Sequence, residues 1–114
     1  MTSSWRYSRK TTSKYKAKKT IVDGIKFDSQ KEALRYKELK LLEKVHKIDN
    51  LRLQVPFTLI DKSKHGRAIK YIADFVYCSN GLEIVEDVKG YKTDVYKLKK
   101  RLLAEKYGIE IKET

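Results

Sequence analysis

The stretch Tyr71-Ile-Ala-Asp-Phe-Val-Tyr77 decides the fold, because it is the most apolar run of the chain and yet contains a carboxylate. It lies within Ala68–Tyr77, where apolar and polar residues hardly alternate, a pattern that favours a strand buried on both faces. The turn-forming residues Ser79-Asn-Gly81 come next and indicate a tight turn between antiparallel strands. We therefore expect Ala68–Tyr77 and Leu82–Lys89 to form a hairpin.

This hairpin brings ionisable side chains together. An isolated charge is costly to bury, so Asp74 must be paired, protonated or bound to a metal. The second strand contains Val85-Glu-Asp-Val-Lys-Gly90, and the two-residue period of a strand places Asp87 and Lys89 on one face. Two carboxylates and an amine then converge on neighbouring strands.

Such a group suits phosphodiester chemistry. Mg²⁺ prefers oxygen ligands and usually takes one or two carboxylates plus water and substrate phosphate. Asp74 and Asp87 would hold the ion, and the main-chain carbonyl of Val88 could add a ligand. Lys89 would position or deprotonate the attacking water, or neutralise charge on the phosphate. The structural alternative is that Lys89 simply pairs with one of the two aspartates.

The residues before this hairpin predict a small hairpin and a helix. Thr20–Phe27 contains Asp23-Gly24 between short apolar runs, which is a hairpin signal. A helix is expected at about 29–46, with an apolar stripe at helical spacing. Ser29-Gln-Lys-Glu32 fits a capping box, so Glu32 is either a cap residue or a third carboxylate that reaches the metal. The expected stripe consists of Leu34, Leu41, Leu42, Val45 and Ile48.

The remaining residues complete a mixed architecture. Leu51–Ile60 is expected to form a strand, and Pro56 indicates that this strand lies at an edge or contains a bulge. A second helix is predicted over Thr93–Tyr107, ended by Gly108, and Ile109–Lys112 should form a last strand. We expect an α/β or α+β fold with a central mixed sheet flanked by helices. The apolar arc of the second helix would contain Val95, Leu98, Leu102 and Leu103.

The charge of the chain indicates a polyanionic partner. The 114 residues have a net charge of +12, and residues 1–20 contain seven basic side chains and no acid. We interpret residues 1–19 as a flexible basic arm for gripping DNA and residues 20–114 as a single domain. The only cysteine is Cys78, and the longest uncharged run has eight residues, so we expect an intracellular, cytoplasmic protein with no membrane span. The basic arm residues are Arg6, Arg9, Lys10, Lys14, Lys16, Lys18 and Lys19.

The order of these motifs resembles the PD-(D/E)XK nuclease superfamily: an acid early on a helix, an Asp on a strand, then acid-x-Lys on the next strand. The resemblance covers residues about 20 to 114 and implies a restriction-endonuclease-like core. It maps Glu32, Asp74, Asp87 and Lys89 onto the active site, with the three acids as ligands of Mg²⁺, or of Mn²⁺ as a substitute. Ala73 stands where the superfamily name has Pro, and Asp87 stands where it often has Glu.

Two narrower resemblances add detail. Val22-Asp-Gly-Ile-Lys-Phe-Asp-Ser-Gln-Lys-Glu32 and the two strand motifs look like a family of small phage and prophage proteins of unknown function. Residues 48–57 resemble the strand before the catalytic Asp in transposon-end-cutting nucleases, which places Gln54 beside the site. Glu86 is the alternative to Asp87 as the acid of the third motif, although the strand period points Glu86 away from Lys89.

These observations together predict a Mg²⁺-dependent DNA endonuclease. We expect it to recognise DNA shape, such as flaps or Holliday junctions, in phage recombination or DNA processing, and to act as a homodimer if both strands are cut. Lys92 and Thr93 at the entrance of the second helix are expected to contact phosphates. Lys99 falls inside the apolar arc of that helix, so its side chain either covers the edge of the core or contacts a phosphate. The alternatives are a non-catalytic nucleic-acid-binding protein on the same fold and RNA in place of DNA.

Overall fold

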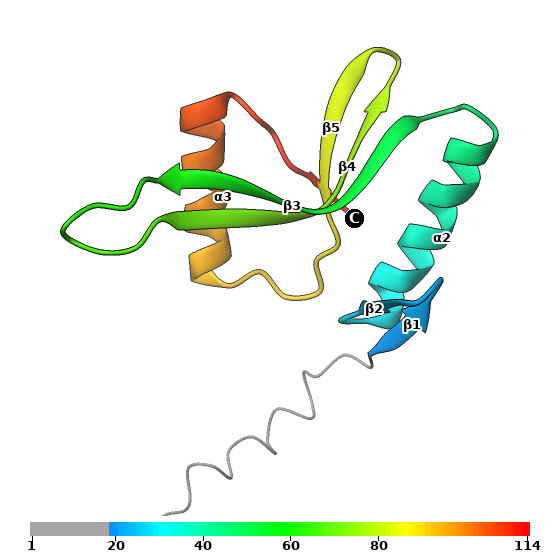
Figure 1. The fold of residues 1–114 in the computed structure, drawn as a ribbon, viewed down its shortest axis with the longest axis horizontal. Coiled ribbons are helices and arrows are strands. Elements are labelled where there is room, and N and C mark those ends of the chain that lie inside the picture. The colour runs from blue at the N-terminus through cyan, green and yellow to red at the C-terminus, as the bar shows by residue number, and fades with distance from the viewer. Residues whose placement is uncertain (1–18) are drawn as a thin grey trace, which may run out of the picture. The chain divides into compact units, whose positions relative to one another are not determined.

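The computed structural model describes residues 19–114. Contacts divide the chain into two compact units, one ending at Lys37 and one running from Glu38 to Thr114, so the division falls inside a helix. The predicted basic arm lies outside the described residues, except for Lys19, which is exposed. The elements are β1 (Thr20–Val22), β2 (Ile25–Phe27), α2 (Gln30–Lys44), β3 (Asp49–Ile60), β4 (Ile69–Ser79), β5 (Leu82–Asp87), α3 (Asp94–Tyr107) and β6 (Lys112–Glu113) (Figure 1).

The predicted N-terminal hairpin is confirmed. β1 pairs antiparallel with β2, and Asp23 and Gly24 have φ angles of 54° and 75°, the left-handed conformation that a two-residue hairpin turn requires. Tyr36 on α2 donates a 3.0 Å hydrogen bond to Asp23 Oδ2, and its ring lies 5.0 Å from that of Phe27. The hairpin is therefore held to the first turns of the helix that follows it.

The face that α2 buries differs from the prediction. Leu34, Leu41 and Val45 of the expected stripe are more than half exposed, whereas Ala33 and Tyr36 are buried. The helical spacing of the leucines did not identify the buried face, because Tyr36 packs its ring against Phe27 and turns its own side of the helix inward.

The four-stranded sheet has the order β3-β4-β5-β6. The first two pairings are antiparallel and β5–β6 is parallel, so the fold is α+β with a mixed sheet and two helices, as predicted. Pro56 lies in β3, which is an edge strand of this sheet, and an edge strand can accommodate a residue that has no N–H to donate.

The predicted β4–β5 hairpin is confirmed. Asn80 and Gly81 form its turn with φ angles of 52° and 78°, and Ser79 pairs with Leu82. β4 is buried on both faces only at Phe75–Tyr77. Before that, buried residues alternate with more exposed ones: Tyr71 and Ala73 are buried, whereas Ile72 is exposed. β5 ends at Asp87, two residues before the predicted end, and β6 begins at Lys112 near the predicted end of the last strand.

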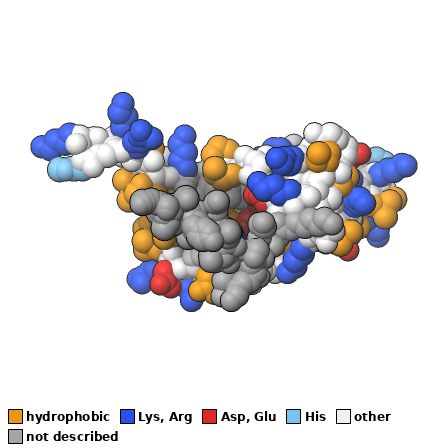
Figure 2. Space-filling view, turned by 90° about the horizontal axis from the view of Figure 1, so that it is seen from below, with side chains coloured by type: hydrophobic (Ala, Val, Ile, Leu, Met, Phe, Trp, Pro, Cys, Tyr) orange, Lys and Arg blue, Asp and Glu red, His pale blue; other side chains and the backbone are white. Residues whose placement is uncertain are grey.

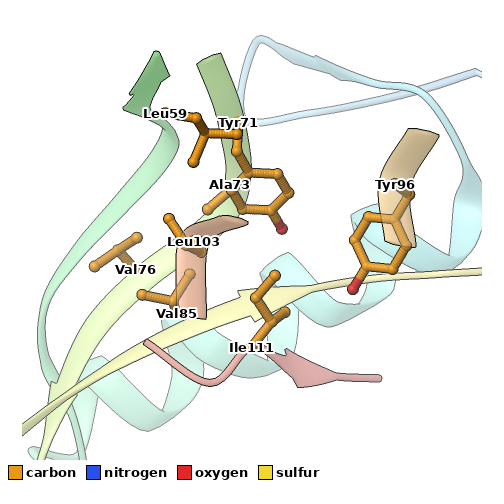
Figure 3. Packing of buried hydrophobic residues seen from close by; sticks show 8 residues of the cluster. All are labelled: Leu59, Tyr71, Ala73, Val76, Val85, Tyr96, Leu103 and Ile111. Atoms are coloured by element: carbon orange, nitrogen blue, oxygen red, sulfur yellow. The ribbon is translucent and has the colours of Figure 1, made fainter. Parts of the chain in front are cut away.

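One face of the sheet packs with α3 around a cluster of buried residues (Figure 3). Tyr96 and Leu103, seven residues apart on α3, are buried in it. Val95 and Leu98 are 62% and 59% exposed, so the predicted apolar arc was wrong for these two residues. The helix is oriented by the aromatic ring of Tyr96, which the arc left out. The cluster consists of Leu59, Tyr71, Ala73, Val76, Val85, Tyr96, Leu103 and Ile111.

The ends of α3 follow the local sequence. Thr93 is the N-cap, because its Oγ1 accepts a 3.0 Å hydrogen bond from the N–H of Tyr96. Gly108, with a φ of 71°, ends the helix and donates its N–H to the carbonyl of Ala104 at 2.9 Å. Neither α2 nor α3 has the length and apolar content that a membrane-spanning helix needs.

Candidate active site

Asp74 and Asp87 face each other across β4 and β5. The N–H of Asp74 donates a 3.2 Å hydrogen bond to Asp87 Oδ1, and the N–H of Val88 donates a 2.9 Å hydrogen bond to Asp74 Oδ2. Each carboxylate is thus bound by the backbone of the neighbouring strand. This reciprocal arrangement fixes both side chains where the pairing of the two strands ends.

Lys89 completes the group. Its Nζ lies 2.9 Å from Asp87 Oδ2 and 4.2 Å from the centre of the Tyr96 ring. The ion pair and the cation–π contact hold the ammonium from two sides. The structure therefore brings Asp74, Asp87 and Lys89 together, as the strand period predicted, whereas their catalytic roles stay a prediction.

One carboxylate oxygen of Asp87 makes no hydrogen bond within the described residues. Asp87 is 1% exposed, yet among residues 19–114 its Oδ2 accepts no hydrogen bond of acceptable geometry, despite the nearby Lys89 ammonium. Tyr71 Oη is also buried and makes no hydrogen bond of acceptable geometry within these residues, and burial, followed by the interaction of its hydroxyl with the Asp87 carboxylate, raises the pKa of the Tyr71 phenol. A buried anionic oxygen is costly, and within the protein the Lys89 ammonium balances its charge.

Main-chain hydrogen bonds border this site. The N–H of Thr114 donates to the carbonyl of Asp87 at 3.0 Å, and the N–H of Lys89 donates to the carbonyl of Thr114 at 3.1 Å. These bonds continue the parallel ladder of β5 and β6 past Asp87. The N–H of Val88 donates to Asp74 Oδ2, and a role for its carbonyl as a metal ligand stays a prediction.

The donor set fits a magnesium ion shared with a substrate. Within the described residues no cluster of three or more Asp, Glu, His or Cys side chains has metal-site geometry. Two carboxylates and one carbonyl nevertheless match the habit of Mg²⁺, which completes its coordination with water and phosphate oxygens. Asp87 Oδ2 makes no hydrogen bond of acceptable geometry within the described residues, and the Lys89 ammonium lies 2.9 Å from it.

Glu32 belongs to a different compact unit from the two aspartates. It is buried in the first turn of α2, and its N–H donates a 3.0 Å hydrogen bond to Ser29 Oγ, which supports the capping role of Ser29. It belongs to the compact unit that ends at Lys37, whereas Asp74, Asp87 and Lys89 belong to the second unit. A role for Glu32 as a metal ligand stays a prediction.

Glu86 has partners of its own. It is fully buried and accepts a 2.6 Å hydrogen bond from Tyr77 Oη and a 3.1 Å hydrogen bond from Thr114 Oγ1. It pairs with Phe75, one residue beyond Asp74, and neighbouring residues of a strand point to opposite faces. The geometry therefore favours Asp87 over Glu86 as the acid of the third motif.

Gln54 has an unusual backbone. It lies between Leu53 and Val55, whose partners on β4 are Phe75 and Ala73, so the register sets Gln54 opposite Asp74. Its φ of 51° is a left-handed conformation inside a strand, and a residue other than glycine rarely adopts it. Strain of this kind tends to cluster at functional sites.

Sequence reasoning missed an acidic anchor next to this site. Glu113 accepts a 2.6 Å hydrogen bond from Tyr96 Oη and forms ion pairs with Lys92 at 3.0 Å and Lys100 at 3.2 Å. The Tyr96 hydroxyl, followed by Lys92, lowers the pKa of Glu113 to about 2. The spacing of Tyr96 and Lys100 on one helix face was the available signal.

Two of the three residues predicted to contact phosphate on and before α3 have partners within the protein. Lys92 is engaged with Glu113, and the Thr93 hydroxyl caps α3. Lys99 is half-buried and makes no ion pair within residues 19–114. Of the three residues, Lys99 has the side chain that is least committed to protein partners.

Among known proteins, this chain resembles one family of proteins. Residues 12–114 match the family described as "Protein of unknown function (DUF1064)". The chain belongs to this family. No curated protein and no solved structure matches it. The DUF1064 match includes Asp74, Asp87, Lys89 and Glu113.

Proposed function

We propose that this DUF1064 protein is a Mg²⁺-dependent endodeoxyribonuclease with Asp74, Asp87 and Lys89 at its centre. The observation that carries the proposal is Asp87 Oδ2: it is buried, has no hydrogen bond of acceptable geometry within the described residues, and lies 2.9 Å from a lysine ammonium. An anionic oxygen in this state, next to a second carboxylate, is suited to a divalent cation.

The reaction needs few groups. Water attacks phosphorus in line, a new P–O bond forms, and the bond to the leaving sugar oxygen breaks, with a proton passing from the water to that oxygen. A bound Mg²⁺ would neutralise phosphate charge and lower the pKa of the attacking water. Asp74, Asp87 and the Val88 carbonyl would hold the ion, and Lys89 would stabilise the charge that develops on the phosphate.

The charge distribution supports DNA as the substrate. The net charge of +12 is large for 114 residues, and phosphate contacts dominate the affinity of nucleic-acid-binding proteins. No sequence-reading module stands out, so we propose recognition of branched DNA such as Holliday junctions or flaps, in phage recombination or DNA processing. A homodimer would supply two active sites for cutting both strands, and the phage setting would place the protein in the cytoplasm of a bacterial host.

A second candidate is a DNA-binding protein without catalysis. The 2.9 Å contact between Lys89 and Asp87 and the backbone bonds to both aspartates favour it, because these contacts stabilise the group without a metal. In this case the ion pair would only close the end of the β4–β5 hairpin. It would keep full DNA affinity after loss of the carboxylates.

A cleavage assay separates the two candidates. Wild type, Asp74→Ala and Lys89→Ala are incubated with Mg²⁺ or Mn²⁺ and with linear duplex, single-stranded, flap and four-way-junction DNA, alongside a matching RNA duplex. Lys97→Ala is the control, because Lys97 is an exposed lysine of α3. The nuclease proposal requires metal-dependent cutting that both site variants lose and the control keeps. Tight, salt-sensitive binding with no cutting of any substrate would leave the non-catalytic candidate.

A further inference from the structure

The β3–β4 hairpin carries an unneutralised basic tip, here called the finger (residues 61–70). It contains Lys62, Lys64, Arg67 and Lys70 and one acid, Asp61, a net charge of +3. All four basic residues are exposed, and none makes an ion pair within the described chain. Figure 2 shows Lys and Arg side chains together with a histidine gathered at one end of that view.

Several other basic residues of the same unit have acidic partners. Arg52 pairs with Glu83 at 2.9 Å, and Lys40 pairs with Glu43 at 3.2 Å. Lys92 and Lys100 share Glu113. The finger therefore concentrates free positive charge, which is the electrostatic footprint of a polyanion contact.

The finger is also internally ordered. Ser63 and Gly66 exchange backbone hydrogen bonds of 3.0 and 3.2 Å, and the N–H of His65 donates to Ser63 Oγ at 3.1 Å. At its base, Tyr107 Oη donates to the carbonyl of Thr58 at 2.7 Å, so α3 braces the hairpin just before the finger begins. Figure 1 shows the finger as the loop that projects beyond α3. A loop whose backbone is already ordered loses little backbone entropy on binding.

From this arrangement we infer that the finger binds the phosphate backbone of duplex DNA to one side of the bond that is cut. The inference rests on the proposed function for its substrate. Gly66 lies eight residues before Asp74, in the loop that precedes β4, and is at most about 26 Å away at 3.3 Å per residue. With about 3.4 Å per base pair, the finger would reach about seven or eight base pairs from the cleaved phosphate.

The test compares two triple variants of the full chain. Lys62→Ala/Lys64→Ala/Arg67→Ala removes three charges from the finger, and Lys44→Ala/Lys97→Ala/Arg101→Ala removes three exposed charges elsewhere. Binding to a 30-base-pair duplex is measured in EDTA between about 50 and 200 mM salt, so that cleavage plays no part. The finger variant should bind about 10–100-fold more weakly than wild type, and its log–log salt slope should fall by about 2.7.

Equal loss in the two variants would overturn the inference, because net charge alone would then explain binding. Wild-type affinity for DNA in the finger variant would overturn the inference as well. The same holds if affinity is unchanged and sedimentation shows that only the self-association of the variant differs. A second series of duplexes, shortened from one end around a fixed flap, should lose affinity once fewer than about seven base pairs remain on the finger side. The finger variant should show no such length dependence. Because binding is measured without metal, the affinities test the finger even if the protein proves not to cleave DNA.

Discussion

Asp87 Oδ1 accepts a hydrogen bond from the N–H of Asp74 at 3.2 Å, so the backbone of one acidic residue orients the carboxylate of the other. The bond uses one oxygen of Asp87 and leaves Oδ2 beside Lys89. Because Asp74 Oδ2 is in turn bound by Val88, the geometry of the pair is set by the main chain of β4 and β5. The consequences can be tested one group at a time.

Asp87→Asn should abolish cleavage while Glu86→Gln retains it. The asparagine keeps the shape of the side chain but removes the charge that would hold a cation, and we expect cleavage to fall at least about a hundredfold. Glu86 is satisfied by Tyr77 and Thr114, and glutamine can still accept from the Tyr77 hydroxyl. Cleavage rates and melting temperatures of both variants provide the check. Loss of cleavage in Glu86→Gln alone, at unchanged stability, would reverse the assignment.

Divalent metal should stabilise the fold. A ligand at ten times its Kd that binds only the native state contributes about 1.4 kcal/mol, which for a domain of this size raises Tm by several degrees. We expect Mg²⁺ or Mn²⁺ to raise the Tm of wild type by this amount and to leave Asp87→Asn unchanged. Na⁺ at matched ionic strength controls for screening. An equal shift in both proteins would contradict a metal site at Asp87.

Tyr96 should position Lys89 through its ring. The ammonium lies 4.2 Å from the ring centre, and the hydroxyl is bound to Glu113. Tyr96→Phe keeps the ring and Tyr96→Leu removes it, so cleavage at saturating DNA should fall about 3–10-fold further in the leucine variant. KM for DNA should change little in either protein. Equal rates in the two variants, corrected for folded fraction, would show that the ring has only a packing role.

Local signals predicted much of the fold, whereas contacts between distant residues were not predictable. Asp23-Gly24 and Asn80-Gly81 gave the two hairpins because the positive φ that their turns need is a property of the residues themselves. The apolar stripes predicted for α2 and α3 were right only in part: Ile48, which follows α2, and Leu103 are buried as expected. Tyr36 and Tyr96 orient these helices through ring contacts that spacing does not reveal.

The candidate site divides in the same way. The two-residue strand period was enough to predict that Asp87 and Lys89 lie beside Asp74. The Glu113 anchor was missed because it joins the last strand to α3, a contact between segments that the sequence does not pair.

Stability should depend on pH through Glu113. Its pKa is lowered from an ordinary 4.5 to about 2, chiefly by the Tyr96 hydroxyl. The folded state thus favours the ionised form, and the stabilisation is present above about pH 4.5 and is lost as pH falls toward 2. Glu113→Gln should lower the free energy of unfolding by about 1.5 kcal/mol at pH 7, a value typical of a hydrogen bond to a charged group. Urea unfolding of both proteins at pH 7 and pH 3 should show the difference shrinking; a constant difference would contradict the linkage.

The backbone at Gln54 should favour glycine over alanine. Both substitutions remove the side chain, so the comparison isolates the φ of 51°, which costs a residue with a Cβ about 1–2 kcal/mol relative to glycine. Gln54→Gly should therefore be about 1 kcal/mol more stable than Gln54→Ala in urea unfolding. Thr58→Gly and Thr58→Ala, in the same strand, give the control, and there alanine should be the more stable. If Gln54→Ala equals or exceeds Gln54→Gly, the left-handed conformation is not a source of strain. If both Gln54 variants also cleave DNA more slowly than wild type at equal folded fraction, the strained residue contributes its amide to the site opposite Asp74.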